Sequence, residues 1–262
     1  MKYVLNVIME LNYVVEGRGE PLVFIHGLSD NLLYWEALAT TLKKDFKVVR
    51  FDLRGHGESP LGDEEITIDT YANDLKNLLD ELDITKANLI GFSLGGAVAM
   101  DFALKFPDSV SSLVLMSTFY KCDDDLAVVF NRFIDALDSS FEDFFDFMLP
   151  KVLCPDVIEN NSEELEFLKR LSSKTANIEA YKMATETCFK YDVENQLSQI
   201  NVPTLIMAGK YDEIFPKSIQ KSLSEKIEHS RLIVFDNLKH NLLVGKNNVV
   251  IVEILKNFYK KR

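Results

Sequence analysis

The sequence predicts an α/β protein in which a mostly parallel central sheet is flanked by helices and carries one helical insertion. Short apolar runs rich in Val, Ile and Leu alternate with longer stretches of helical periodicity, which is typical of a parallel sheet covered by helices. One interval of about 80 residues breaks this alternation and contains no strand-like run. With 262 residues, 47% of them hydrophobic, the chain can bury one sizeable core plus an elaboration.

Seven apolar runs have the length and composition of buried strands. They are Leu11–Glu16, Leu22–His26, Lys47–Asp52, Lys86–Phe92, Val110–Met116, Pro203–Ala208 and Arg231–Asp236. The stretches between them show the apolar spacing of amphipathic helices. These predicted helices are Tyr34–Lys44, Ile66–Leu82, Leu94–Phe106, Pro216–Ile227 and Val249–Tyr259.

The helical insertion, Phe119–Gln199, has a composition of its own. It holds 17 acidic and 8 basic residues, and nine of the 18 phenylalanines of the chain. An acidic exterior around aromatic residues is expected of a helical cap over an apolar pocket, so residues 1–118 and 200–262 would form the core domain and 119–199 the cap. We select Phe130, Phe133 and Phe144 as candidate pocket residues, although these rings could instead fill a core of the insertion itself.

Charge and cysteine content argue against several classes of protein. The net charge of −12, from 41 acidic and 29 basic residues, repels phosphate backbones, so we predict no nucleic-acid partner. Cys122, Cys154 and Cys188 are odd in number and lack the paired spacing of a metal site, which favours a reducing cytoplasm without disulfides or structural metal. The segment Met1–Leu11 lacks a cleavage site, and no segment reaches the roughly 20 apolar residues of a membrane span, so we expect neither export nor a membrane span.

A candidate nucleophile, Ser93, lies between a predicted strand and a predicted helix. The segment Gly91–Gly96 (GFSLGG) follows the apolar run Ala87–Ile90 and has the Gly-x-Ser-x-Gly pattern. This pattern needs a sharp turn that strains the serine backbone and exposes its hydroxyl, with glycines where side chains would collide with the neighbouring strand and helix. The helix that follows directs unpaired N–H groups at the same place, so the N–H of Leu94 could stabilise an oxyanion.

Taken together, these motifs resemble the α/β-hydrolase family over essentially the whole chain apart from the insertion. The segment Val23–Leu28 (VFIHGL) looks like the family's strand and His-Gly turn, whose following N–H, here that of Leu28, would be the second oxyanion donor. The segment Phe51–Ser59 (FDLRGHGES) matches the family's Asp-x-Arg-Gly-x-Gly-x-Ser loop. The resemblance implies a Ser, Asp and His triad in that chain order.

Of the four histidines, His240 is the best candidate for the base that activates the serine. It follows the strand Arg231–Asp236 by four residues, which resembles the family position of the base. The loop departs from the family pattern, because Lys239 takes the place of a common Gly and Asn241-Leu242-Leu243 follow the histidine. We expect His26 and His56 to shape their loops, and His229 to lie exposed at a helix end.

The third residue of a triad is an ionised carboxylate that orients the imidazole. Asp212, directly after the strand Pro203–Ala208, resembles the Asp of the family's Gly-x-x-Asp turn. Glu213 and the acidic run Asp123–Asp125 remain alternatives, the latter following the strand Val110–Met116.

The resemblance implies acyl transfer through an acyl-enzyme, with no cofactor and no metal. Small carboxylesterases and enol-lactone hydrolases resemble the chain best, so the expected substrate is a small to medium, largely apolar carboxylic ester. Carbon-carbon bond hydrolases and cofactor-free haloperoxidases use the same triad and stay as enzymatic alternatives. A small-molecule binding protein on this fold is the non-enzymatic alternative, and the sequence leaves a monomer and a homodimer equally open.

Overall fold

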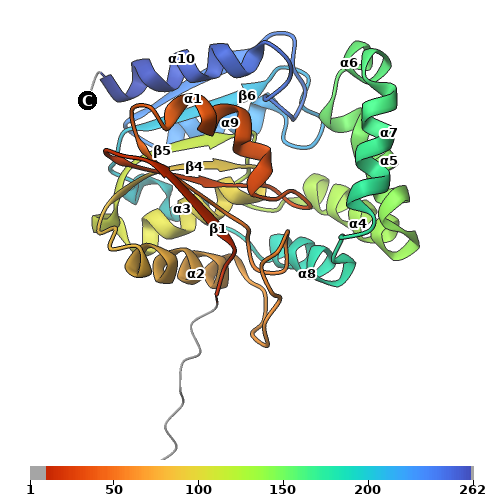
Figure 1. Ribbon diagram of the computed structural model, residues 1–262, viewed down its shortest axis with the longest axis horizontal. Coiled ribbons are helices and arrows are strands. Elements are labelled where there is room, and N and C mark those ends of the chain that lie inside the picture. Colours follow the sequence, from red (N-terminus) through yellow and green to blue (C-terminus); the bar gives the residue numbers. More distant parts are fainter. Residues whose placement is uncertain (1–9, 261–262) are drawn as a thin grey trace, which may run out of the picture.

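The computed structural model describes residues 10–260 and is built on a seven-stranded sheet in the order β1-β3-β2-β4-β5-β6-β7 (Figure 1). Strand β1 runs antiparallel to β3, and every other neighbouring pair is parallel. The predicted fold class is confirmed, and each predicted strand lies within two residues of an observed one. The strands are β1 Tyr13–Gly17, β2 Pro21–Ile25, β3 Lys47–Phe51, β4 Ala87–Phe92, β5 Val110–Met116, β6 Thr204–Gly209 and β7 Ser230–Phe235.

Helices cover both faces of the sheet, as a parallel sheet requires. Because side chains alternate along a strand, Leu22 and Phe24 of β2 pack on one face with α1 and α10, whereas Val23 and Ile25 pack on the other face with α2 and α3. In Figure 1, α10 lies above the strands and α2 below them. These flanking helices are α1 Glu36–Leu42, α2 Ile68–Glu81, α3 Leu94–Lys105, α9 Lys217–Lys226 and α10 Asn247–Lys260.

The helix predicted over 34–44 is shorter than expected and begins differently. A 3-10 turn, η1 Leu32–Trp35, precedes α1, and the side chain of Asn31 caps it by accepting a hydrogen bond from the N–H of Leu33. Trp35 is fully buried and packs against Phe24 with ring centroids 4.9 Å apart. The buried indole therefore anchors the turn that leads from β2 into α1.

The chain between β5 and β6 forms five α-helices, which Figure 1 shows gathered at one side of the sheet. The two ends of this segment meet in a short antiparallel bridge between Lys121 and Asp192, flanked by backbone hydrogen bonds Cys122 N to Tyr191 O and Val193 N to Tyr120 O. A narrow neck of this kind supports the domain boundaries at 118/119 and 199/200, which stay a prediction. The helices are α4 Asp124–Ser139, α5 Phe141–Val152, α6 Pro155–Asn160, α7 Ser162–Ser172 and α8 Ile178–Phe189.

No helix between residues 10 and 260 is long and apolar enough to cross a membrane. The expectation about export rests mostly on residues 1–9, which lie outside the described part of the chain.

Candidate active site

Ser93 occupies a strained turn between β4 and α3. Its backbone angles are φ 54° and ψ −119°, in a region that residues with a Cβ rarely adopt. Two hydrogen bonds hold the turn: the N–H of Ser93 donates to the carbonyl of Met116, at 2.9 Å, and the hydroxyl of Thr118 donates to the carbonyl of Ser93, at 2.7 Å. Neighbouring β5 thus fixes the direction in which the serine points.

Close packing around this turn explains its glycines. A Cβ on Gly95 would lie 2.2 Å from the carbonyl oxygen of Ile25, so α3 can approach the end of β2 only because that atom is missing. A Cβ on Gly27 would lie 3.2 Å from the Cβ of Ser93. The His-Gly turn that precedes Leu28 is therefore directly beside the candidate nucleophile.

His240 and Asp212 form a buried pair at the ends of β7 and β6. Nδ1 of His240 lies 2.9 Å from Oδ2 of Asp212, and their residues are 3% and 5% exposed. Since a carboxylate can only accept, Nδ1 is the donor, and this tautomer leaves Nε2 free to accept a proton. The other carboxylate oxygen accepts two backbone N–H bonds, from Ile214 and Phe215, each at 2.9 Å.

The imidazole of His240 is also held by aromatic rings. Its centroid lies 5.0 Å from that of Phe92 and 5.3 Å from that of Phe215, and Phe92 in turn stacks on Tyr34 at 4.7 Å. With one nitrogen hydrogen-bonded and the ring packed against two others, the imidazole has one well-defined orientation.

The other histidines lie outside the cavity. His26 is buried, with Nδ1 2.8 Å from the carbonyl of Gly27 and Nε2 accepting from the N–H of Leu53, so it braces two loops. His56 is buried beside it, with ring centroids 5.3 Å apart, whereas His229 is exposed. Burial lowers the pKa of His26 to about 4 and that of His56 to about 3, so both remain neutral at physiological pH.

The alternative acids have other partners. Asp123 caps α4 by accepting from the N–H of Leu126, and Glu213 forms an ion pair with Lys239. Neither touches His240 among the described hydrogen bonds. Within residues 10–260, no group of three His, Cys, Asp or Glu side chains is arranged to bind a metal ion.

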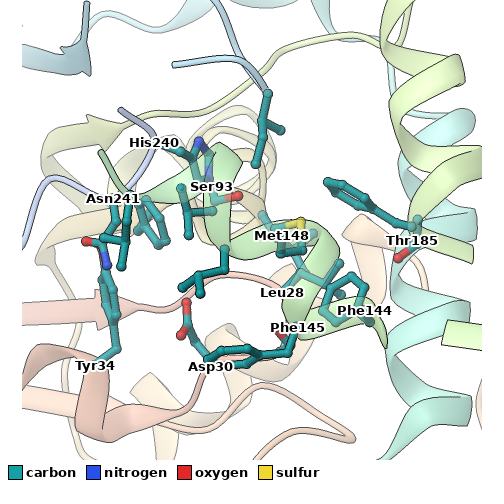
Figure 2. Close-up of a pocket in the computed structure, with 18 of the residues that line it drawn as sticks. Leu28, Asp30, Tyr34, Ser93, Phe144, Phe145, Met148, Thr185, His240 and Asn241 are labelled. Carbon is teal, nitrogen blue, oxygen red and sulfur yellow. The ribbon is translucent and has the colours of Figure 1, made fainter. Parts of the chain in front are cut away.

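Ser93 and His240 line one cavity of about 260 Å³. Leu28 and Leu94 line it too, and so do the three phenylalanines selected from the sequence. In Figure 2, Ser93 and His240 lie together in the upper part of the cavity, and Phe144 and Phe145 lie below and to the right. The structure thus brings every sequence-selected site residue except Asp212 to one cavity, and Asp212 contacts His240, which lines it. The selected phenylalanines are Phe130, Phe133 and Phe144.

Sequence reasoning missed several residues of this cavity. Asp30 and Tyr34 line it from the loop and turn after β2, and Phe215 lines it from the loop after β6. The rule that ligands bind beyond the carboxyl ends of parallel strands would have drawn attention to all three. Cys188 also lines the cavity, but burial raises the pKa of its thiol well above the ordinary value, so it is no rival nucleophile.

Lys239 and Asn241, which flank His240 and depart from the family pattern, both contact the insertion. The ammonium of Lys239 donates to the carbonyl of Pro150, at 2.6 Å, and the N–H of Asn241 donates to the carbonyl of Val152, at 3.0 Å. The side-chain oxygen of Asn241 accepts from the hydroxyl of Tyr34, at 3.1 Å. Lys239 and Asn241 therefore connect the histidine loop to the end of α5.

Comparison with known proteins agrees with this architecture. A family model described as alpha/beta hydrolase fold matches residues 20–154, about half of the chain, and the protein belongs to this family. An uncharacterized protein of Mycobacterium tuberculosis is 40% identical over 103 residues, but the match spans only 39% of this chain and 30% of that protein.

Two further similarities cover nearly the whole chain. The 3-oxoadipate enol-lactonase 2 of Acinetobacter baylyi is 27% identical over 228 residues, which is 86% of this chain and 85% of that enzyme. The solved structure of a thermophilic esterase from Thermogutta terrifontis superposes with a TM-score of 0.85 at 25% identity, covering 97% of this chain and 94% of the other.

Proposed function

We propose that the protein is a serine hydrolase that cleaves carboxylic esters through an acyl-enzyme. Ser93 is the nucleophile, His240 the general base and Asp212 the carboxylate that orients it. The observation that carries the proposal is the 2.9 Å bond between His240 and Asp212, placed so that the imidazole enters the cavity lined by Ser93. The named esterase and enol-lactonase similarities support the same chemistry.

Each step of the reaction uses one of these groups. The hydroxyl oxygen of Ser93 attacks the ester carbonyl while Nε2 of His240 takes the hydroxyl proton. The N–H groups of Leu28 and Leu94 stabilise the oxyanion, and the tetrahedral intermediate then collapses, releasing the alcohol with the proton from His240. A water molecule, deprotonated by the same imidazole, cleaves the acyl-serine bond and releases the carboxylic acid.

The cavity indicates an ester with a largely apolar group. Rings from α4 and α5 form the wall opposite the strand ends, and we interpret the insertion as a cap that excludes water from this space. Exclusion of water lowers the local dielectric constant, which strengthens the hydrogen bonds to the oxyanion that forms when Ser93 attacks. A cavity of about 260 Å³ suits a compact substrate rather than a long-chain lipid.

Hydrolysis of short p-nitrophenyl esters, together with labelling by a fluorophosphonate, tests this proposal. We expect the wild-type protein to turn over the esters and to become labelled, and the Ser93→Ala variant to lose labelling and all but residual turnover, by a factor on the order of 10⁴–10⁶. Turnover that persists in Ser93→Ala would refute the role of the serine. A folded wild-type protein that shows neither turnover nor labelling would favour a small-molecule binding protein instead.

A lactone is a second candidate substrate, because a lactone is a cyclic ester and the enol-lactonase of Acinetobacter baylyi matches most of the chain. The same triad would open the ring without releasing a separate alcohol. Measuring kcat/KM on a panel of open esters, lactones and vinylogous diketones decides between these activities. The substrate class with the largest kcat/KM identifies the protein as an esterase, a lactonase or a carbon-carbon bond hydrolase.

A further inference from the structure

Asp30 is the one acidic residue among the described residues that line the cavity, most of which are apolar or aromatic. It lies on the loop after the His-Gly turn, and Figure 2 shows its carboxyl group directed into the space between Tyr34 and the residues around Leu28. Its backbone N–H donates to the carbonyl of Gly27, which fixes the loop. Among residues 10–260, no hydrogen-bond or ion-pair partner is recorded for the carboxylate of Asp30, and no Lys or Arg side chain lines the cavity.

The surroundings of Asp30 favour a positive charge beside it. Burial raises the pKa of its carboxyl to about 7, and the electrostatic interaction with His240 partly offsets this effect. Burial and then the charge of Asp30 raise the pKa of Tyr34, and Asp30 also contributes to the raised pKa of Tyr181, which packs from α8. Asp30 is partly exposed, at the wall of the cavity. A carboxylate held there away from bulk water and without a counterion is costly, and a cationic ligand group would lower that cost.

Two further features suit a cation at this place. Aromatic rings line the same cavity, and ring faces attract ammonium groups. The helical insertion that contributes to the cavity has 17 acidic and 8 basic residues, and a net negative charge of this kind attracts cations rather than anions. A hydroxyl group on the ligand would gain only a hydrogen bond from Asp30, whereas a protonated amine gains a hydrogen bond, a neutralised charge and the contact with the rings.

We propose that Asp30 is a specificity-determining residue that binds a protonated amine on an otherwise apolar substrate. The ester bond would lie at Ser93 and the ammonium group at Asp30, with the apolar part of the substrate against the phenylalanines. This inference rests on the proposed function, because it takes the same cavity as the substrate pocket.

The test measures binding rather than turnover. Calorimetric titration at pH 8 compares hexylammonium with hexanol, two ligands of equal length that carry no ester. We expect the wild-type protein to bind hexylammonium at least about tenfold more tightly than hexanol, since an ion pair in a desolvated pocket is worth more than a neutral hydrogen bond. Asp30→Asn should bind both ligands about equally, and its retained binding of hexanol shows that the pocket is intact.

Asp135→Asn is the matched control, because Asp135 is an exposed acid of α4 that does not line the cavity, and the variant should keep the wild-type preference. The preference should also weaken at pH 6, where Asp30 is mostly protonated, while hexylammonium stays charged. Equal affinities in the wild type, or a preference that survives in Asp30→Asn, would overturn the inference. Because neither ligand is a substrate, loss of esterase activity with an intact ammonium preference would refute the proposed function and leave this binding site standing.

Discussion

The two walls of the cavity are built by different means. On the strand-end wall, Ser93 and His240 are held by backbone geometry and by short hydrogen bonds, including the 2.9 Å bond to Asp212. On the insertion wall, Phe130 and Phe133 are held by edge-to-face ring contacts, with centroids 6.0 Å apart. Hydrogen bonds and strained turns fix directions, whereas apolar packing fixes a volume and tolerates exchange of its members.

This difference assigns separate tasks to the two walls. Reaction chemistry needs atoms at defined positions, and the strand-end wall supplies them. Selectivity needs a shaped apolar volume, and the insertion wall supplies that. Substitutions on the strand-end wall should therefore change the rate for every ester, while those on the insertion wall should change the ranking of esters.

Among variants that keep Ser93, Asp212→Asn should have the largest effect. An amide in place of the carboxylate cannot stabilise the imidazolium and favours the wrong tautomer of His240, so we expect kcat to fall by about 10⁴ for all esters alike. Steady-state kinetics on short and longer p-nitrophenyl esters measures this fall. Glu213→Gln is the matched control, and we expect it to change kcat by less than about tenfold, because Glu213 pairs with Lys239 and does not contact the imidazole. The opposite ranking of the two variants would assign the acid to Glu213.

The sequence predicted the reactive groups of the strand-end wall more directly than the other residues of the cavity, and the reason is physical. A turn that needs glycine and a strand that needs apolar residues leave local patterns, so the position of Ser93 could be read from one chain. Asp212 was selected from its place after a strand together with its resemblance to the family's Gly-x-x-Asp turn. A phenylalanine meets its partners through helix packing, which leaves no local pattern. Phe215 and Asp30 lie on loops beyond the strand ends, which the strand pattern does locate, but neither belongs to a motif, and only the tertiary arrangement of these loops turns their side chains toward the cavity.

Phe133→Leu tests the insertion wall. Phe133 is buried, lines the cavity and contacts Phe130, Phe144 and Phe147 through its ring. A smaller side chain enlarges the cavity, so we expect the ratio of kcat/KM for a longer acyl ester to that for an acetate ester to rise by about tenfold.

Phe106→Leu makes the same chemical change away from the cavity and should leave this ratio unchanged. If Phe133→Leu instead lowers kcat equally for both esters, the separation of tasks between the two walls is wrong.

Lys239→Met tests the link between the walls. The substitution keeps the aliphatic stem but removes the ammonium that joins the histidine loop to the carbonyl of Pro150 and to Glu213. Loss of a charged hydrogen bond of this kind should lower the free energy of unfolding by about 1–2 kcal/mol and speed amide exchange at Asn241, whose N–H donates to Val152.

Lys210→Met serves as the control for Lys239→Met, because Lys210 forms an exposed ion pair with Asp236 outside the cavity. It should change stability by less than about 1 kcal/mol and leave the exchange rate at Asn241 as it is. Equal behaviour of the two variants would show that the histidine loop does not depend on the insertion.

The smallest expected effect concerns the two buried histidines, His26 and His56, beside the contact of His56 with α8 of the insertion. The ring of His56 lies 4.9 Å from that of Tyr181 on α8 and 5.3 Å from that of His26 in the core. Because burial lowers the pKa of His56 from 6.5 to about 3, the unfolded chain binds this proton before the folded protein does, and stability falls as the pH falls below about 6.5. Between pH 7 and pH 6 this amounts to about 0.7 kcal/mol for each of His26 and His56. Denaturant unfolding of His56→Phe, which keeps an aromatic ring against Tyr181, should lose the contribution of His56, so its change in stability between pH 7 and pH 6 should differ from that of the wild type by about 0.7 kcal/mol. The raised pKa of Asp30 acts in the opposite direction in both proteins and cancels from this difference. An equal pH dependence in both proteins would mean that His56 is protonated in the folded protein and that water reaches it.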